Sequence, residues 1–391
     1  LKNYIKSSIY GTTMFEKMGF AYMGPFDGHN IEQLCSAFEI AKNKKEPVMI
    51  HVITKKGKGY DFAEKSPSTF HGISKFDVGT GESALSNKTY SDVFGEKLCD
   101  EADKNDKICA ITAAMSLGTG LEKFSINHTE RFFDVGIAEE HAVIFASGLA
   151  KNKMLPVFCV YSTFLQRCYD QIIHDCAMQN LKMIFAIDRA GFVGVDGESH
   201  QGLFDVPFLN TVPNIEVYSP SSFEELNKVF DKSVNTGENA VAIRYPRGVE
   251  DVLPDDFVVS DNDFDIYGDE GETAIVTYGR LFSNACRAKE ILSKKGINIK
   301  IIKLNKIKPI NETVFENISS FNNIFFFEES VKDGSVSEKF GSRLLEKGYK
   351  GNYFVTAVED GFVKHASVES QIKKYGLDAD SMVKKVSENI G

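Results

Sequence analysis

Two apolar stretches of the chain, residues 155–161 and 182–188, each end in a group of aromatic, charged and glycine residues. Apolar stretches of this length, rich in β-branched residues, are typical of strands buried in a sheet. Amphipathic segments with helical spacing alternate with such strands, which predicts an α/β protein with mostly parallel sheets. Ligands bind at the carboxyl ends of the strands in these sheets. The sequence therefore predicts a site for a small, anionic, partly aromatic ligand after these two strands.

The predicted elements fall into three parts joined by two linkers, and we expect successive doubly wound domains. The first part contains only one predicted helix and one predicted strand, so it needs partners from elsewhere to complete a sheet. The first linker is rich in Gly, Ser, Pro and Lys, and the second is acidic without apolar periodicity. In chain order, the three parts and two linkers are residues 1–60, 61–89, 90–250, 251–270 and 271–391.

The composition excludes several classes of function. The net charge is −10, and Lys and Arg are scattered rather than clustered, which argues against a nucleic-acid partner. No stretch is long and apolar enough to span a bilayer. The seven cysteines form no Cys-x-x-Cys pair, which indicates reduced thiols in the cytoplasm. The chain starts with Leu1 rather than Met, and we interpret this as a cut end.

Glu139 lies in the first turn of a helix predicted over residues 137–150. A carboxylate there is stabilised by the helix dipole, and by itself this bland explanation is the better one. A buried carboxyl at this position could instead share a proton with a heterocyclic nitrogen.

Tyr161, Phe164 and Arg167 follow the strand at 155–161 at steps of three, which brings them near one face of the next predicted helix, 163–179. They could be two core rings and a surface cation. Alternatively, the rings form a platform for a flat ligand and the guanidinium meets an anion. The residues alone leave both open.

Arg189, Asp196 and His200 lie in a loop that contains four glycines, and Arg247 follows the last strand of the second part. Glycines let the backbone approach a ligand closely, a guanidinium binds phosphate oxygens through two donors, and His transfers protons near neutral pH. We favour a functional loop over a simple turn, and we expect Arg167, Arg189 and Arg247 to converge on one anion.

Lys56 lies in a run of Lys and Gly that precedes the first linker, and His71 lies within that linker. Such a run is usually a solvated loop, although it could also fold over an anionic ligand.

Taken together, these residues closely resemble the 1-deoxy-D-xylulose-5-phosphate synthase family, whose members are transketolase-like enzymes that depend on thiamine diphosphate. The resemblance covers essentially the whole chain, and the combination is far more specific than any one motif. It is carried by these segments: 24–29, 55–60, 70–71, 134–142, 161–171, 188–202 and 245–248.

The resemblance implies a role for each of these side chains. Glu139 would be the acid that hydrogen-bonds the aminopyrimidine ring of the cofactor, Phe164 would stack on that ring, and Lys56 would also contact the cofactor. The predicted substrate contacts are Tyr161, Arg189 and Arg247 at the phosphate, together with Arg167 and His71. Asp196 and His200 would orient substrate groups or move protons.

The implied reaction is decarboxylation of pyruvate and carboligation to D-glyceraldehyde 3-phosphate, which gives 1-deoxy-D-xylulose 5-phosphate for isoprenoid, thiamine and pyridoxal synthesis. The family binds the diphosphate and Mg²⁺ through a Gly-Asp-Gly…Asn motif that is absent here, so we predict no metal ligands in this chain. We therefore expect a carboxy-terminal portion of a homodimeric enzyme, inactive alone, whose remainder is either missing or supplied by a separate polypeptide.

Two other interpretations were weighed. One is the β-type subunit of a thiamine-dependent 2-oxoacid dehydrogenase. The arginines at 189 and 247 argue against it, because they are suited to bind a phosphate. The other is a non-catalytic dimerisation or regulatory half, against which the joint presence of Glu139, Phe164 and His200 argues.

Overall fold

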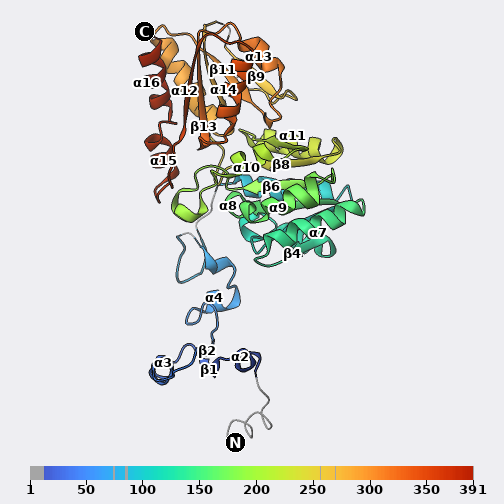
Figure 1. Ribbon diagram of the computed structural model, residues 1–391, viewed down its shortest axis with the longest axis vertical. Helices are drawn as coiled ribbons and strands as arrows, with labels where there is room; N and C mark the ends of the chain where they lie inside the picture. Colours follow the sequence, from blue (N-terminus) through green and yellow to red (C-terminus); the bar gives the residue numbers. More distant parts are fainter. Residues whose placement is uncertain (1–12, 74, 84–86, 256, 269, 391) are drawn as a thin grey trace, which may run out of the picture. The chain divides into compact units, whose positions relative to one another are not determined.

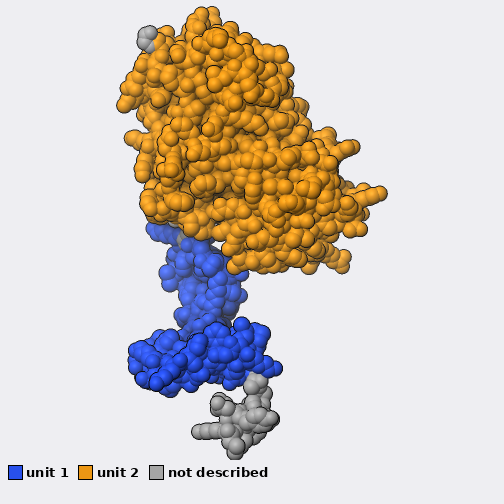
Figure 2. Space-filling model, in the orientation of Figure 1, with its two compact units in different colours: residues 1–86 blue, residues 87–391 orange. Residues whose placement is uncertain are grey.

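The computed structural model describes residues 13–73, 75–83, 87–255, 257–268 and 270–390. Contacts divide the chain into two compact units, residues 1–86 and residues 87–391 (Figure 2). The predicted first part therefore lies in the first unit, apart from residues 1–12, which are outside the described residues. No helix among the described residues is long and apolar enough to cross a membrane.

The first unit contains a two-stranded parallel sheet, in which β1 (Ala21–Asp27) pairs with β2 (Val48–Ile53) and α3 (Ile31–Lys42) connects them. The sequence analysis missed β1, because its Gly and Pro interrupt the apolar pattern. Of the α3 side chains, only Ala37 is buried. Two short helices complete the unit, α2 (Met14–Lys17) and α4 (Asp61–Lys65).

The segment predicted as the first linker is not structureless. It contains α4, and the rings of Phe62, Phe70 and Phe76 gather around Tyr60 at centroid distances of 5.4–5.9 Å. Four aromatic rings are enough to organise a short segment whose sequence shows no periodicity.

The second unit begins with a seven-stranded sheet in the order β12-β7-β8-β6-β5-β3-β4. Figure 1 labels its strands β4, β6 and β8. All its strand pairs are parallel except β12 with β7. Its strands are β3 (Ile108–Thr112), β4 (Phe132–Asp134), β5 (Leu155–Tyr161), β6 (Ile184–Asp188), β7 (Ile215–Tyr218), β8 (Ala240–Arg244) and β12 (Lys306–Lys308).

Helices cover both faces of this sheet, because successive side chains along its strands are buried on opposite faces. Along β5, Val157 and Cys159 point into one core with Phe94 of α5, whereas Phe158 and Val160 point into another. The helices of this part are α5 (Tyr90–Ala102), α6 (Glu122–Asn127), α7 (Glu139–Lys151), α8 (Ser162–Leu165), α9 (Tyr169–Gln171), α10 (Asp205–Thr211) and α11 (Phe223–Asn235).

The helix predicted over residues 163–179 is not continuous. It consists of α8, a turn of 3₁₀ helix, α9 and a π-helical turn over Ile172–Ala177. Leu165, Cys168, Ile172 and Cys176 are all buried in the same core. Their spacing is helical, so the sequence predicted one helix, and the breaks lie in backbone hydrogen bonding that the side-chain pattern does not reveal.

The second unit ends with a five-stranded sheet in the order β14-β13-β10-β11-β9, parallel except for β9. Its strands are β9 (Phe264–Tyr267), β10 (Thr273–Tyr278), β11 (Lys300–Leu304), β13 (Asn323–Val331) and β14 (Asn352–Val358). Its helices are α12 (Leu281–Lys294), α13 (Thr313–Ile318), α14 (Val336–Glu346), α15 (Val368–Lys374) and α16 (Ala379–Asn389). The acidic second linker thus contains an edge strand, β9, which the sequence analysis missed.

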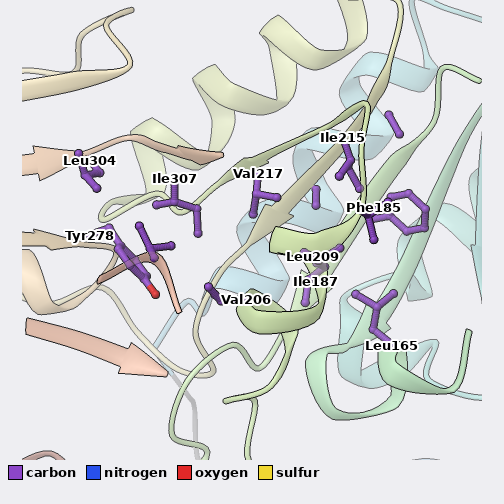
Figure 3. Close-up of a cluster of buried hydrophobic side chains, with 14 of the residues drawn as sticks. Leu165, Phe185, Ile187, Val206, Leu209, Ile215, Val217, Tyr278, Leu304 and Ile307 are labelled. Atoms are coloured by element: carbon purple, nitrogen blue, oxygen red, sulfur yellow. The ribbon is translucent and has the colours of Figure 1, made fainter. Parts of the chain in front are cut away.

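One hydrophobic core joins the two sheets of this unit. Figure 3 shows Tyr278 and Leu304 of the five-stranded sheet near Ile307 of β12, with Val206 and Val217 beyond. Strand β12 belongs to the predicted third part by sequence, yet it pairs with β7 of the seven-stranded sheet. The two sheets are therefore packed as one body.

Candidate functional site

The predicted site residues of the second unit follow neighbouring strands of the seven-stranded sheet. Tyr161 ends β5 and is in register with Asp188, which ends β6, and β8 runs parallel beside β6. The carboxyl ends of these strands form one edge, so the loops that follow them meet there.

Glu139 is the first residue of α7, and its side chain is only 3% exposed. Its Oε2 accepts a hydrogen bond from Nη1 of Arg167 at 3.0 Å. Burial of a carboxylate requires such a partner. Arg167 is the one hydrogen-bond partner found for this carboxylate within the described residues.

Two aromatic residues, Tyr161 and Phe164, shortly precede Arg167 in the sequence. Phe164 stacks on Tyr161, with ring centroids 6.0 Å apart and an interplanar angle of 24°. The ring of His200 meets Phe164 at 5.4 Å and 79°, edge to face. The three rings come from the end of β5, from α8 and from the 3₁₀ turn at residues 198–200, and they form a half-buried aromatic wall.

Arg189 connects the aromatic wall to the charged part of the site. Its guanidinium lies 3.8 Å from the centroid of the Tyr161 ring, and Nη1 donates to the backbone oxygen of Gly118 at 2.6 Å. Nη1 also donates to Oδ1 of Asp188 at 2.9 Å. Burial raises the pKa of the Tyr161 hydroxyl, and the charge of Arg189 opposes that shift. The phenol therefore stays protonated as a hydrogen-bond donor.

Asp196 lies between two guanidinium groups. It pairs with Nη1 of Arg247, and its Oδ2 lies 3.8 Å from Nε of Arg189. Two guanidinium groups thus meet at Asp196, and Arg189 also pairs with Asp188, so the two cations are balanced by two carboxylates. Oxygens of a phosphate could be bound at the same place.

The structure brings two of the three arginines to one carboxylate, and their convergence on an anionic ligand remains a prediction. Arg189 and Arg247 meet at Asp196, whereas Arg167 pairs with Glu139. Lys56 and His71 belong to the first unit, and their participation remains a prediction. Around Lys56, the neighbouring Lys55 and Lys58 both pair with Glu64.

The sequence analysis did not single out Asp188 or Gly118 as part of the site. Asp188 is fully buried, accepts from Oγ of Ser91 at 2.6 Å and pairs with Arg189. A Cβ on Gly118 would overlap the Tyr161 hydroxyl, so only glycine fits there. The Gly-Thr-Gly run at residues 118–120, after β3, is the sequence feature that could have predicted this close approach.

The residues present fit the aminopyrimidine end of thiamine diphosphate. That ring requires an acid beside its nitrogen and an aromatic face, and Glu139 is a buried acid and Phe164 a half-buried ring, so the residue types agree with this requirement. Among the described residues, no group of three or more His, Cys, Asp or Glu side chains is arranged to hold a metal ion.

The comparisons with known proteins match the chain in three consecutive segments. The family model described as "Transketolase, pyrimidine binding domain" matches residues 86–249, and "Transketolase, C-terminal domain" matches residues 265–382. The model described as "1-deoxy-D-xylulose-5-phosphate synthase" matches residues 1–54.

Two solved structures have the same fold. A chain titled "Split gene transketolase, inactive beta4 tetramer" has a TM-score of 0.68 at 23% identity, over 77% of this chain and 98% of that one. Transketolase from Campylobacter jejuni has a TM-score of 0.66 at 15% identity, over 98% of this chain and 70% of that one. Fold and site together define a transketolase-like chain of the class that uses thiamine diphosphate.

Curated relatives identify the family within this class. A 1-deoxy-D-xylulose-5-phosphate synthase of Clostridium beijerinckii is 43% identical over 99% of this chain, and that of Caldanaerobacter subterraneus is 44% identical over 98%. The chain belongs to the 1-deoxy-D-xylulose-5-phosphate synthase family. It spans 63% and 62% of the length of these two relatives, so it corresponds to a portion of such an enzyme.

Proposed function

We propose that this chain is the part of a 1-deoxy-D-xylulose-5-phosphate synthase that binds the aminopyrimidine of the cofactor and the phosphate of the acceptor. The reaction joins pyruvate to D-glyceraldehyde 3-phosphate and releases carbon dioxide. The observation that carries the proposal is the continuous series of contacts from Arg189 through Tyr161 and Phe164 to His200, with Asp196 and Arg247 at its cationic end.

The proposed division of the chain follows the sequence boundaries. Residues 90–250 form the pyrimidine-binding domain and residues 271–391 the carboxy-terminal domain, and residues 1–60 are the remnant of a diphosphate-binding domain. Residues 61–89 and 251–270 are the connecting segments. Support comes from the two sheets of the second unit and from the small, incomplete sheet of the first.

Each side chain has a proposed task. Arg167 holds the buried carboxyl of Glu139 so that its free oxygen hydrogen-bonds the aminopyrimidine, and Phe164 stacks on that ring. When bound, thiamine diphosphate supplies the electron-accepting group that decarboxylation and carbon–carbon bond formation require. The participation of Lys56 at the cofactor and of His71 at the substrate rests on the sequence alone.

The acceptor would be held at the cationic end of the site. Arg189 and Arg247 bind its phosphate, with the hydroxyl of Tyr161 as a further donor. Asp196 holds the two guanidinium groups apart and in place before the phosphate arrives. His200, fixed edge-on to Phe164, moves a proton at the reacting carbonyl oxygen.

We further propose where the metal ion and the diphosphate bind and how the enzyme assembles. Mg²⁺ and the diphosphate would be bound by residues of the portion of the relatives that this chain does not span. The working enzyme would be a homodimer in the cytoplasm, without membrane or nucleic-acid partners. Five buried cysteines form no disulfide among the described residues, which agrees with a reducing compartment; they are Cys99, Cys109, Cys159, Cys168 and Cys176.

The test supplies the amino-terminal portion of the Clostridium beijerinckii relative as a separate polypeptide, with thiamine diphosphate and Mg²⁺. We expect carbon dioxide release from pyruvate together with formation of 1-deoxy-D-xylulose 5-phosphate when glyceraldehyde 3-phosphate is present. Acyl transfer to a lipoyl group instead would point to a 2-oxoacid dehydrogenase subunit. The absence of any cofactor-dependent reaction would refute the proposal.

A variant of the same mixture tests the principal residue. Glu139→Ala should reduce turnover by at least about 100-fold, because the aminopyrimidine loses the acid that shares its proton. Circular dichroism should show an unchanged fold. Turnover near that of the unmodified chain would remove Glu139 from the mechanism.

A further inference from the structure

The loop that carries Arg189, Asp196 and His200 is closed on itself at its base. Gly191 and Gly202 exchange two backbone hydrogen bonds, of 2.7 and 2.8 Å. Between these two glycines the loop contains only short 3₁₀ turns. Within the loop, the side chain of Gln201 accepts from the N–H of Val193 at 3.0 Å and donates to the oxygen of Gly197 at 3.3 Å, and contacts with neighbouring elements add to these bonds.

The main neighbour is a buried ion pair from the five-stranded sheet. Arg280 precedes α12 and Glu329 lies in β13, and their side chains are 8% and 7% exposed. The Nε of Arg280 donates to both carboxylate oxygens of Glu329, at 3.1 and 2.9 Å, and Nη2 pairs with Oε1. This is a two-pronged contact between buried side chains.

The ion pair captures both backbone polar groups of one loop residue. The N–H of Phe192 donates to Oε1 of Glu329 at 2.7 Å, and Nη2 of Arg280 donates to the Phe192 oxygen at 2.7 Å. A Cβ on Gly191 would overlap the carboxylate of Glu329, so the loop lies directly on it. We define these four residues, Gly191, Phe192, Arg280 and Glu329, as the loop clamp.

The clamp acts next to a strained residue of the proposed phosphate site. Arg189 has a φ of 60°, a left-handed conformation that costs a non-glycine residue on the order of 1 kcal/mol. Such a conformation persists only where the surroundings hold it. The clamp begins two residues later, so it is well located to keep the Arg189 guanidinium against Tyr161.

A second contact at the far end of the loop is weaker. Lys364 pairs with Glu198 at 2.7 Å, but both side chains are well exposed, at 72% and 41%. Exposed pairs of this kind contribute between nothing and about 1 kcal/mol. The buried clamp should therefore dominate the position of the loop.

We propose that Arg280 and Glu329 are positioning residues, by which the five-stranded sheet sets the geometry of the phosphate-binding loop. This inference rests on the proposed function for the identity of the ligand. Loss of the clamp should let Arg189 and Asp196 drift, which weakens binding of the phosphorylated acceptor more than it affects pyruvate, because pyruvate has no phosphate.

The first measurement needs no activity. In hydrogen exchange on the 391-residue chain, Glu329→Ala should speed exchange of peptides within residues 189–204 by about tenfold or more. Glu329→Gln keeps an acceptor for the Phe192 N–H and should give a smaller change. If Glu329→Ala does not fold, Gly191→Ala displaces the carboxylate without removing a charge and should give the same result.

The second measurement uses the reconstituted mixture with the amino-terminal portion of the relative. Glu329→Ala should raise KM for glyceraldehyde 3-phosphate about tenfold, with KM for pyruvate within about threefold. Glu328→Gln is the matched control, because Glu328 is also buried in β13 but binds Tyr278 and the start of α14 rather than the loop. It should lower thermal stability without changing either KM. Lys364→Ala should leave all kinetic constants unchanged.

The outcomes separate the two proposals. Unchanged exchange of residues 189–204 in Glu329→Ala and Gly191→Ala would overturn the clamp, whether or not the mixture is active. Faster exchange with an unchanged KM for glyceraldehyde 3-phosphate would overturn its positioning role while leaving the proposed reaction intact. An inactive unmodified mixture would refute the proposed function, and the exchange result would then decide the clamp by itself.

Discussion

At the scale of single residues, the site is organised by partners that lie far apart in the sequence. Arg189 and Arg247 share Asp196, and Arg167 holds Glu139 across 28 positions of the chain. Arg167 is thereby fixed at the buried acid, whereas Arg189 and Arg247 are fixed at a shared carboxylate.

Asp188 gives the site a titratable group that is not exposed to solvent. Burial is the main cause that raises its pKa from 3.8 to about 6, against the opposing effects of Arg189 and Ser91. Between these two pH values the folded chain holds a proton that the unfolded chain has lost. The stability contributed by the protonated carboxyl is therefore present at low pH and is lost as the pH rises through about 6.

The Asp188→Asn variant tests this at the residue scale. The variant lacks this titratable carboxyl. The difference in free energy of unfolding, variant minus unmodified chain, should therefore increase by about 2–3 kcal/mol from pH 4 to pH 6.5. Urea unfolding followed by circular dichroism at several pH values measures the difference. A difference that stays constant across this range would mean that Asp188 titrates near its ordinary value.

At the scale of elements, buried charges connect the two sheets of the second unit. Lys303 of β11 has a fully buried side chain and pairs with Glu225 of α11, which covers the seven-stranded sheet. Glu225 also accepts from the backbone N–H of Ser221 at 2.7 Å. A desolvated pair of this kind contributes orientation as much as stability.

Removing one partner should cost more than removing both charges. Lys303→Met should lower the free energy of unfolding by about 3–5 kcal/mol, because it leaves the Glu225 carboxylate buried and without its cation. Lys303→Met combined with Glu225→Gln should recover more than half of that loss, since Gln keeps an acceptor for Ser221. Denaturant unfolding of the three chains measures both values, and equal stability of the single and double variants would contradict the argument.

At the scale of the whole molecule, the first unit has apolar side chains that its own sheet does not cover. Ile31, Phe38 and Ile40 of α3 are 69%, 50% and 56% exposed. A two-stranded sheet with one helix is too small to be stable by itself. These side chains are consistent with the proposal that residues 1–60 complete a larger domain.

Addition of the amino-terminal portion of the relative should therefore protect this unit. Hydrogen exchange of residues 31–53 should slow by about tenfold or more in the mixture, whereas peptides of the buried strand β5 should not change. Phe38→Ser should reduce both the protection and the activity of the mixture. Activity without added protection would show that the two polypeptides associate through another surface.

The sequence was sufficient for most of the regular structure. The strand predicted at 155–161 has the bounds of β5, and β6 lies within the stretch predicted at 182–188, because buried parallel strands are short, apolar and flanked by turn residues. Strands β1, β9 and β12 were missed, since a Gly-Pro interruption, an acidic edge and a three-residue length each remove that pattern.

The local sequence was enough to locate three features of the site. These are the residues at the ends of the strands, the glycines of the loop after β6, and the acid at the start of α7. Only the tertiary structure decided which cation each carboxylate takes, that Asp188 is buried with Arg189, and that β13 clamps the loop after β6. The physical reason is distance along the chain. Strand and helix patterns repeat within a few residues, whereas Phe192 and Glu329 are 137 positions apart and meet only when two sheets pack together.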